Sequence, residues 1–258
     1  MGASVRSPPA TALPPAARAL VRRPSLAACF AAIRAPELYR NFAIHIFVMF
    51  PAALAMTWIA TKVDSALGLA PFLPLPARLA AGALTIITGG VWVWYVYGYL
   101  YLSGGGSPGT HVDGGPTAMV DTGPYTLVRH PSVLGKLAGV IGLGIAFGST
   151  VFLVGFVPVL VLYSLVTNRY LQERFCDQRF GDRYQAYRQR VPMLLPRPAG
   201  IGRWLRDEAA LGEEDHLLPP PAQVHPPGVW GELRWYLVGL LGLLGVFGTV
   251  ALIANLLH

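Results

Sequence analysis

Apolar residues in this chain are gathered into long continuous runs, separated by polar segments and by segments rich in Gly and Pro. Five runs are long enough to cross the ~30 Å hydrocarbon core of a bilayer as helices, which takes about 20 residues. They lie near residues 42–61, 79–102, 132–148, 150–168 and 235–257. The pattern predicts an all-α integral membrane protein with about five transmembrane helices.

The third and fourth runs are joined by Gly148, Ser149 and Thr150, which predicts a tight helical hairpin at one membrane face. Glycines in the third run are spaced for close packing against a neighbouring helix. These are Gly135 with Gly139, and Gly144 with Gly148.

The fourth run has no helix breaker between Val159 and Glu173, so we expect its helix to continue beyond the membrane. On the same helix, Phe180, Tyr184 and Tyr187 follow helical spacing. They are predicted to form a buried stripe that folds back on the membrane domain.

Four segments follow from this pattern. Residues 1–40 are predicted to form a disordered or interfacial N-terminal leader, 41–196 the membrane core, 197–231 a Pro-rich cytoplasmic loop, and 232–258 a C-terminal transmembrane helix. The Ala/Pro/Arg-rich leader leaves a transit peptide as an alternative, although its early prolines oppose a continuous helix. The last helix has glycine at every third position from Gly239 to Gly248, which suits packing within the protein or in a homo-oligomer.

The composition supports a bilayer environment, because only 13% of the residues are charged, against about 25% in soluble domains. Six arginines precede the first run, Arg129 lies in the second loop, and ten lie between Arg169 and Arg234, so 17 of the 20 basic residues fall on one side. By the positive-inside rule that side, with the N-terminus, is cytoplasmic. The net charge of +7 therefore follows a membrane pattern, and no nucleic-acid partner is expected.

Two features argue against other kinds of site. Cys29 and Cys176 show no repeated Cys/His spacing, so neither a disulfide nor a metal site is expected. The glycine-rich segment 103–109 follows no predicted strand, so it does not indicate a nucleotide-binding sheet. Any cofactor site must therefore be built from helix ends and loops.

Charged residues flank the third and fourth runs. Pro131 suits the first position of a helix, which makes His130 the N-cap and points free amides at the loop, a setting suited to an anion. Alternatively, Arg129 and His130 only cap the helix and meet lipid phosphates. Arg169 and Glu173 are four residues apart and share a helix face. A carboxylate so close to the membrane needs a partner, and a cationic ligand would serve.

Two blocks of residues resemble a known superfamily. The first runs Gly123-Pro124-Tyr125 to Arg129-His130-Pro131, and the second contains Glu173, Phe180-Gly181, Tyr184 and Tyr187. Together, over residues 103–196, they resemble the isoprenylcysteine carboxyl methyltransferase and phospholipid methyltransferase superfamily. The resemblance implies a cytoplasmic pocket for S-adenosylmethionine beside a tunnel that opens into the bilayer.

The resemblance also implies roles for particular residues. The cofactor would be held by Thr117, Met119, Val120, Tyr125, His130, Pro131, Ser132, Val133 and Glu173. Arg129 adds positive charge suited to the cofactor's carboxylate. Arg169 and Glu173 are the candidate catalytic residues, with Arg169 facing the substrate. The chain departs from the family at Val133, where a tyrosine is usual, and at Gln172, where a second glutamate is frequent.

This resemblance predicts S-adenosylmethionine-dependent methyl transfer to a lipidic or hydrophobic acceptor, such as an isoprenylcysteine carboxylate, a phospholipid or a small thiol. The expected location is the bacterial cytoplasmic membrane, or the endoplasmic reticulum in a eukaryote. Two alternatives remain open. One is an NADPH-dependent membrane sterol reductase, which has a related Arg-His-Pro segment. The other is a catalytically inactive membrane scaffold, suggested by Val133 and Gln172.

Overall fold

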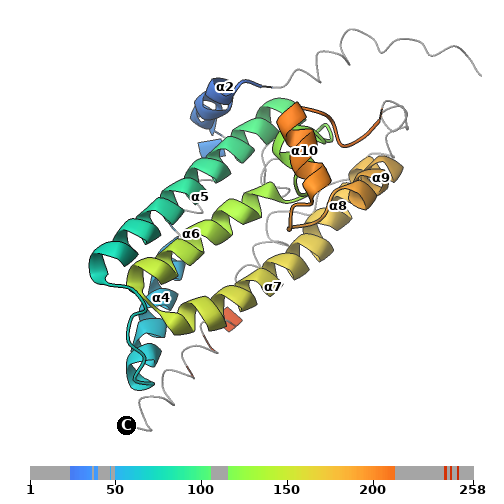
Figure 1. The fold of residues 1–258 in the computed structure, drawn as a ribbon. Helices are drawn as coiled ribbons and strands as arrows, with labels where there is room; N and C mark the ends of the chain where they lie inside the picture. Colours follow the sequence, from blue (N-terminus) through green and yellow to red (C-terminus); the bar gives the residue numbers. More distant parts are fainter. Residues whose placement is uncertain are drawn as a thin grey trace, which may run out of the picture.

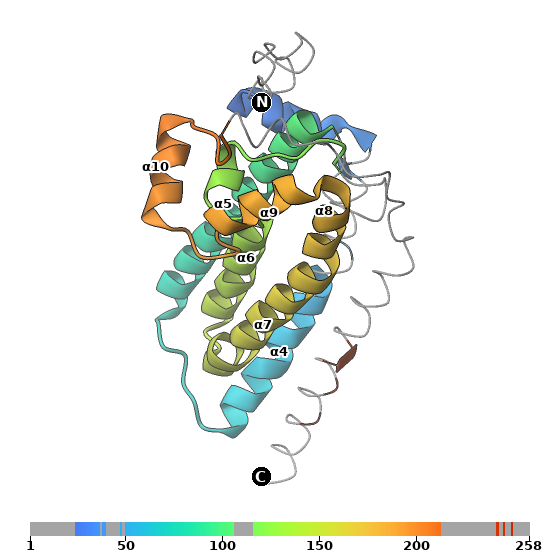
Figure 2. The same ribbon diagram turned by 90° about the vertical axis from the view of Figure 1, so that its right-hand side faces the viewer.

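The computed structural model describes residues 24–36, 38–39, 47, 50–105, 116–212, 241–242, 245 and 249. Within these ranges every regular element is helical and no strand occurs. The long elements are α4 (Phe50–Ala66), α5 (Leu75–Gly104), α6 (Pro131–Phe147) and a continuous helix from Phe152 to Phe180. They form an elongated bundle (Figures 1 and 2).

Short helices gather at the end of the bundle where α5 ends and α6 begins (Figure 1). They are α2 (Leu26–Ala31), η1 (Ala32–Arg34), η3 (Gly123–Thr126), α9 (Asp182–Arg190) and α10 (Pro198–Arg206). We call this the site end. At the opposite, far end, α4 leads into α5 and α6 turns into the helix that begins at Phe152.

Two helices, α5 and Phe152–Phe180, are long and apolar enough to cross a membrane, and α6 is apolar but has 17 residues. These correspond to the predicted runs 79–102, 150–168 and 132–148. The first predicted run, 42–61, is described from Phe50 onward, as α4. Most of residues 42–49 and 235–257 lie outside the described residues. Of the glycine stripe predicted for the last helix, Gly242 and Gly245 are described as helical, and a Cβ added to either would meet nothing within 4 Å.

Helices α5 and α6 are in close contact through glycines. A Cβ added to Gly135 would lie 2.6 Å from the carbonyl oxygen of Gly89, and one added to Gly142 would lie 2.8 Å from that of Gly82. Gly139, which the spacing pairs with Gly135, takes part through its backbone, because its N lies 2.9 Å from a Cβ added to Gly89. A Cβ added to Gly139 itself would meet nothing within 4 Å, so the contacts do not follow the predicted four-residue spacing. The contacts instead repeat every seven residues, two helical turns apart, so that one face of each helix is held against the other.

The far end is fixed by polar contacts. Gly148, at φ 67°, ends α6, as the hairpin prediction requires. Asp64 of α4 is buried, and its Oδ1 accepts the N–H of Val151 at 2.9 Å, while its Oδ2 accepts the hydroxyl of Ser149. Arg78 donates to the carbonyl of Phe147 at 3.1 Å. Three helices are therefore tied together where the hairpin turns.

The helix from Phe152 to Phe180 contains two π turns, η4 (Phe152–Phe156) and η5 (Asn168–Gln172), with α7 (Val157–Thr167) between them. The first precedes Pro158, which has no N–H to donate to an α-helical bond. The second leads into α8 (Glu173–Phe180), and there the N–H of Glu173 donates to the carbonyl of Asn168. The helix thus continues past the predicted span.

The predicted stripe of Phe180, Tyr184 and Tyr187 does not lie on one helix. Gly181 adopts φ 54° and ψ −133°, which ends α8, and α9 starts at the next residue. A positive φ costs glycine little, so this break is available to the sequence. Tyr184 and Tyr187 are nevertheless buried, at 4% and 2% exposure, and Phe180 packs against their cluster.

Two segments that were predicted to lie outside the membrane core contain helices. Residues 197–231 were predicted to form a loop, but α10 occupies 198–206, with Pro198 in its first turn and Asp207 in the left-handed conformation at its end. In the predicted leader, α2 packs against α5 and the side chain of Cys29 is fully buried near Tyr99. The loop prediction was therefore wrong for 198–206.

The glycine contacts between α5 and α6 predict different effects of two alanine substitutions. Gly135→Ala should destabilise the protein by about 1–3 kcal/mol, because the added Cβ overpacks the contact with Gly89. Gly139→Ala is the matched control and should be neutral or stabilising by up to about 1 kcal/mol, since alanine favours the helix. Thermal unfolding in detergent measures both. Equal melting temperatures for the two variants would contradict the close packing.

Candidate functional site

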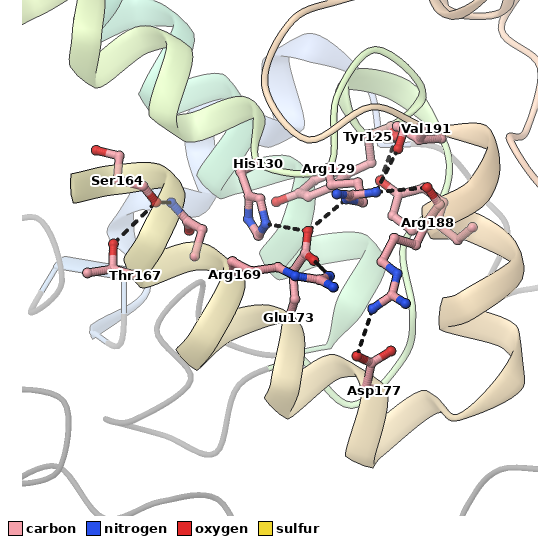
Figure 3. A network of polar contacts seen from close by, with 12 residues as sticks. Tyr125, Arg129, His130, Ser164, Thr167, Arg169, Glu173, Asp177, Arg188 and Val191 are labelled. Carbon is pink, nitrogen blue, oxygen red and sulfur yellow. Dashed lines mark hydrogen bonds and ion pairs between the residues drawn. The ribbon is translucent and has the colours of Figure 1, made fainter. Parts of the chain in front are cut away.

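A fully buried carboxylate, that of Glu173, lies at the site end at the base of α8. Its Oε1 is 2.8 Å from Nε of Arg129 and 3.4 Å from Nε2 of His130, and its Oε2 accepts a hydrogen bond from Nη1 of Arg169 at 2.7 Å. Figure 3 shows the three basic side chains converging on it. Residues 129–130 and 169–173, which lie in separate sequence motifs, therefore meet at one point.

Local structure places these groups. Pro131 begins α6 and His130 is its N-cap residue, as the sequence predicted, although His130 makes no side-chain cap bond. The indole of Trp92 in α5 donates to the carbonyl of Pro131 at 2.8 Å. The backbone N–H groups of Arg129 and His130 donate to Pro192 and Met193, at 2.9 and 3.3 Å. The start of α6 is thus held from both α5 and the segment after α9.

Arg129 connects more of the chain than its motif suggests. Its Nη1 donates to the carbonyls of Arg188 and Val191, at 2.8 and 3.1 Å, while its Nε faces Glu173. Its side chain is 10% exposed, so this is a nearly buried ion pair. Such a pair is tolerated because further hydrogen bonds satisfy the charges. One guanidinium therefore joins the start of α6, the base of α8 and the end of α9.

The centre of this cluster retains binding capacity. Three buried atoms lie within ion-pair distance but lack hydrogen-bond geometry in the described part of the chain: Nε of Arg129, Nε2 of His130 and Oε1 of Glu173. Buried polar atoms normally have hydrogen-bond partners. Their convergence indicates a place where a polar ligand could complete the bonding.

A cavity of about 90 Å³ adjoins the cluster. Its walls come from the end of α5, the segment 116–120, η3, the start of α6, and α8 and α9. The lining residues are Leu100, Pro116, Ala118, Met119, Val120, Tyr125, Arg129, His130, Pro131, Ser132, Gln172, Cys176, Phe180, Tyr184 and Tyr187. Positive charge thus lies beside walls that are mainly apolar and aromatic.

Seven residues singled out from the sequence line this cavity: Met119, Val120, Tyr125, Arg129, His130, Pro131 and Ser132. Three do not. Thr117 is exposed and its hydroxyl donates to the carbonyl of Gly104 at 3.1 Å. Val133 packs in a core cluster with Leu137, and Glu173 lies behind its basic partners.

Sequence reasoning missed part of the wall. Gln172 was seen only as a departure from the family, and Cys176 only as a free thiol. Both line the cavity, and so do Phe180 and Tyr184, which were assigned to packing. These four residues recur at every fourth position, which was a visible signal. The signal is weak on its own, because the same spacing also fits a stripe that only packs.

The sequence-predicted catalytic pair is brought together, but in two different environments. Glu173 is buried, whereas 49% of the Arg169 side chain is exposed. Arg169 therefore holds the carboxylate with one part of its guanidinium and presents the rest to the outside. Among the described residues no group of His, Cys, Asp or Glu could hold a metal ion, and Cys29 and Cys176 are both free thiols.

Burial lowers the pKa of His130, and the Arg129 charge adds to that effect, while the adjacent Glu173 carboxylate opposes it. The net direction is downward, so the imidazole is neutral at pH 7 and can donate or accept one hydrogen bond at each nitrogen. Burial also raises the pKa of Tyr125 well above its usual range, so its phenol stays protonated. The charges at the site are therefore those of Arg129, Arg169 and Glu173.

A strap formed by residues 207–212 supports the cavity from outside. The N–H of Leu211 donates to Oδ2 of Asp121 at 3.0 Å, and the N–H of Ala210 donates to the Asp121 carbonyl at 2.8 Å. Ala210 and Leu211 are buried against Tyr184 and Tyr187. The strap thus holds the aromatic wall from behind.

The described residues thus form an all-helical bundle with a charged pocket made of loops and helix ends. The model of the phospholipid methyltransferase family matches residues 77–183. The protein-S-isoprenylcysteine O-methyltransferase of Schizosaccharomyces pombe is 34% identical over 84 residues, which is 30% of this chain and 33% of that protein. The chain thus matches about a third of the length of this relative. No solved structure matches the chain.

These matches confirm the resemblance to the isoprenylcysteine carboxyl methyltransferase and phospholipid methyltransferase superfamily. The family match runs from the start of α5 to the first turn of α9. It therefore contains Arg129, His130, Arg169 and Glu173 and most of the cavity wall, while the strap lies beyond it.

The strap generates a prediction about stability. Asp121→Ala should destabilise the protein by about 1–3 kcal/mol, because the buried N–H of Leu211 loses its acceptor. Proteolysis after residue 206 should also become faster. Glu208→Ala is the control, since its exposed pair with Arg206 contributes little. Melting temperatures and timed proteolysis measure both effects, and a strap that stays protected in Asp121→Ala would refute this anchoring role.

The lowered pKa of His130 generates a prediction about pH. An unfolded chain takes up this proton near pH 6.5, whereas the folded protein does so only at lower pH. Stability should therefore fall as the pH drops below 6.5, by at most about 1.4 kcal/mol per pH unit for this group. His130→Gln should lose less stability than the wild type between pH 7 and 5. Parallel pH profiles of melting temperature for the two proteins would contradict the lowered pKa of His130 in the folded protein.

Proposed function

We propose that this protein transfers a methyl group from S-adenosylmethionine to a lipidic or hydrophobic acceptor at the cytoplasmic face of a membrane. The observation that carries the proposal is the buried Glu173 carboxylate with Arg129 and His130, set beside a cavity with aromatic walls. This arrangement lies within the region that matches the methyltransferase family.

The residues present fit the proposed cofactor. S-adenosylmethionine has a carboxylate, an ammonium and a sulfonium, so its site needs groups of both signs. Arg129 and the amides at the start of α6 suit the carboxylate. Glu173 does not line the cavity in the structure, and it would pair with a cationic group once the cavity has widened. The half-satisfied atoms of Arg129, His130 and Glu173 would gain partners. We assign the adenosine to the aromatic walls, near Tyr125.

The remaining cofactor residues are proposed in two groups. Met119, Val120, Tyr125, Pro131 and Ser132 line the cavity and would contact the cofactor directly. Thr117 and Val133 lie outside the cavity walls and would act by shaping the segments that carry their neighbours. Gln172, Cys176 and Phe180 join the first group on the strength of their position.

Cofactor binding requires the cavity to widen. Small-molecule sites commonly measure about 300–1,000 Å³, whereas this cavity measures about 90 Å³. Glycine contacts between α5 and α6 hold that wall of the cavity in place. We therefore expect the side chains of the opposite wall to move, where Gln172, Phe180 and Met119 are only partly buried.

When bound, the cofactor supplies a methyl carbon already activated by positive sulfur. The chain's own residues then have to orient the reactants and exclude water. The half-exposed Arg169 would hold an anionic acceptor next to Glu173, which keeps its guanidinium in place. A carboxylate or thiolate acceptor needs no general base, and this favours such acceptors over an ammonium group.

The acceptor class follows from the chemistry and the relatives. The S. pombe relative is named for an isoprenylcysteine, and the matching family is named for phospholipids. For this chain we propose an acceptor whose apolar tail lies in the bilayer and which enters the site from there. The group that is methylated would be an isoprenylcysteine-like carboxylate, a phospholipid headgroup or a small thiol. The distribution of arginines supports a cytoplasmic site and a cytoplasmic N-terminus. The proposed location is the bacterial cytoplasmic membrane, or the endoplasmic reticulum in a eukaryote.

Calorimetry with S-adenosylmethionine and S-adenosylhomocysteine tests the proposal on detergent-purified protein. We expect micromolar binding by the wild type and at least a tenfold loss in Glu173→Gln, because the amide cannot pair with a cationic group. Glu208→Gln is the matched control, since this exposed glutamate lies outside the cavity, and its affinity should be unchanged.

Melting curves of the three proteins separate loss of binding from loss of folding. Arg129 keeps two carbonyl partners in Glu173→Gln, so we expect this variant to fold with a melting temperature below that of the wild type. No binding to a folded wild type would overturn the proposed function, and unchanged affinity in a folded Glu173→Gln would remove Glu173 from the cofactor site.

A further inference from the structure

Helix α10 has three unlike faces, which follow from the turn of about 100° per residue in an α-helix. Gly200 and Trp204 face the protein: Gly200 is buried against the carbonyl of Thr126, and Trp204 contacts Trp92 edge-to-face at 6.1 Å. Ile201 and Leu205 lie on one flank of this inner face, and Arg203 and Arg206 lie on the other flank. The helix therefore separates apolar from basic residues along its sides.

The apolar flank is open in the described part of the chain. Leu205 is 73% exposed, Ile201 is 42% exposed, and Leu195, just before the helix, is 78% exposed. Large apolar side chains exposed together mark an interaction surface. On the basic flank, Arg206 forms an exposed ion pair with Glu208.

The position of α10 indicates what its apolar flank contacts. Figure 2 shows the helix at the edge of the site end, on the α5 side. On α5, Leu84, Ile87 and Val91 form a strongly exposed apolar stripe on a helix suited to cross a membrane. Trp92, the next residue after Val91, is the contact of Trp204. The contact of Trp204 with Trp92 therefore places α10 beside α5 at the end of this exposed stripe, with Ile201 and Leu205 on the neighbouring flank of α10.

We propose that α10 is an interfacial helix that inserts Leu195, Ile201 and Leu205 into the acyl-chain region of the leaflet at the site end. The exposed Arg206 then lies on the headgroup side, where its charge is hydrated, together with the partly buried Arg203. Amphipathic helices with a basic polar face and a face of large apolar side chains lie in the membrane plane in this way. The partner is a phospholipid leaflet. The inference depends on α5 spanning the membrane and is independent of methyl transfer.

This contact would set the depth of the pocket. Gly200 packs on η3, which carries Tyr125 of the cavity wall, and the strap that follows α10 is bonded to Asp121. A helix fixed in the leaflet thus places the pocket close to the membrane surface. A lipidic substrate could then present its reactive end without leaving the bilayer.

The test uses the full chain in nanodiscs of phosphatidylcholine whose acyl chains carry bromine, a short-range fluorescence quencher. A bimane label is placed at Leu205→Cys and, as the matched control, at Glu208→Cys, in a background with Cys29→Ala and Cys176→Ala. We expect the label at 205 to be quenched by the brominated chains and shielded from aqueous iodide. The label at 208 should show the reverse pattern.

Two results would overturn the proposal. Iodide quenching at 205 as strong as at 208 would place the apolar flank in water. Shielding at 205 without bromine quenching, together with a larger assembly by light scattering, would show that a second copy covers the flank. Because each label is read without cofactor or acceptor, these results stand apart from the calorimetric test of methyltransferase function.

Discussion

The carboxylate of Glu173 holds together segments that are far apart in the sequence. It is fully buried and faces Arg129, His130 and Arg169, and Arg129 in turn bonds to the carbonyls at the end of α9. A charge at this depth is tolerated only with its partners in place, and removing one partner of such a pair typically costs about 3–5 kcal/mol. The start of α6, the base of α8 and the end of α9 must therefore assemble together.

The two walls of the cavity differ in what stabilises them. On the side of α5 and α6, glycines bring two backbones into direct contact, so the wall depends on the absence of side chains. On the side of α8 and α9, the wall depends on aromatic packing and on the strap bonded to Asp121. A site built from helix ends in this manner needs no sheet. One of its walls is held rigid by backbone contact, and the position of the other wall depends on contacts with distant parts of the chain.

Helical periodicity and motif spacing predicted much of this arrangement from the sequence. The apolar runs predicted α5, α6 and the helix that begins at Phe152, and Pro131 predicted that His130 is an N-cap residue. The distribution of arginines already placed Arg129 and the segment that begins at Arg169 on one side of the membrane, and the family resemblance brought Arg129 and Glu173 to one pocket. The break at Gly181 was missed because glycine is compatible with both continuing and ending a helix, and its φ of 54° depends on tertiary contacts. Helix α10 was missed because prolines dominate its surroundings, and the anchoring of residues 210–211 on Asp121 spans 90 positions that no local pattern connects.

The helix from Phe152 to Phe180 is held by a buried carboxylate near each of its ends. At the far end Asp64, on α4, receives the N–H of Val151, and at the site end Glu173, on the helix itself, faces Arg129 and His130 before α6. A helix rises 1.5 Å per residue, so a lengthwise slip of even one residue would break both attachments. The length of the apolar segment between them therefore acts as a fixed spacer. Insertions or deletions there should be far less tolerated than substitutions that only exchange one apolar side chain for another.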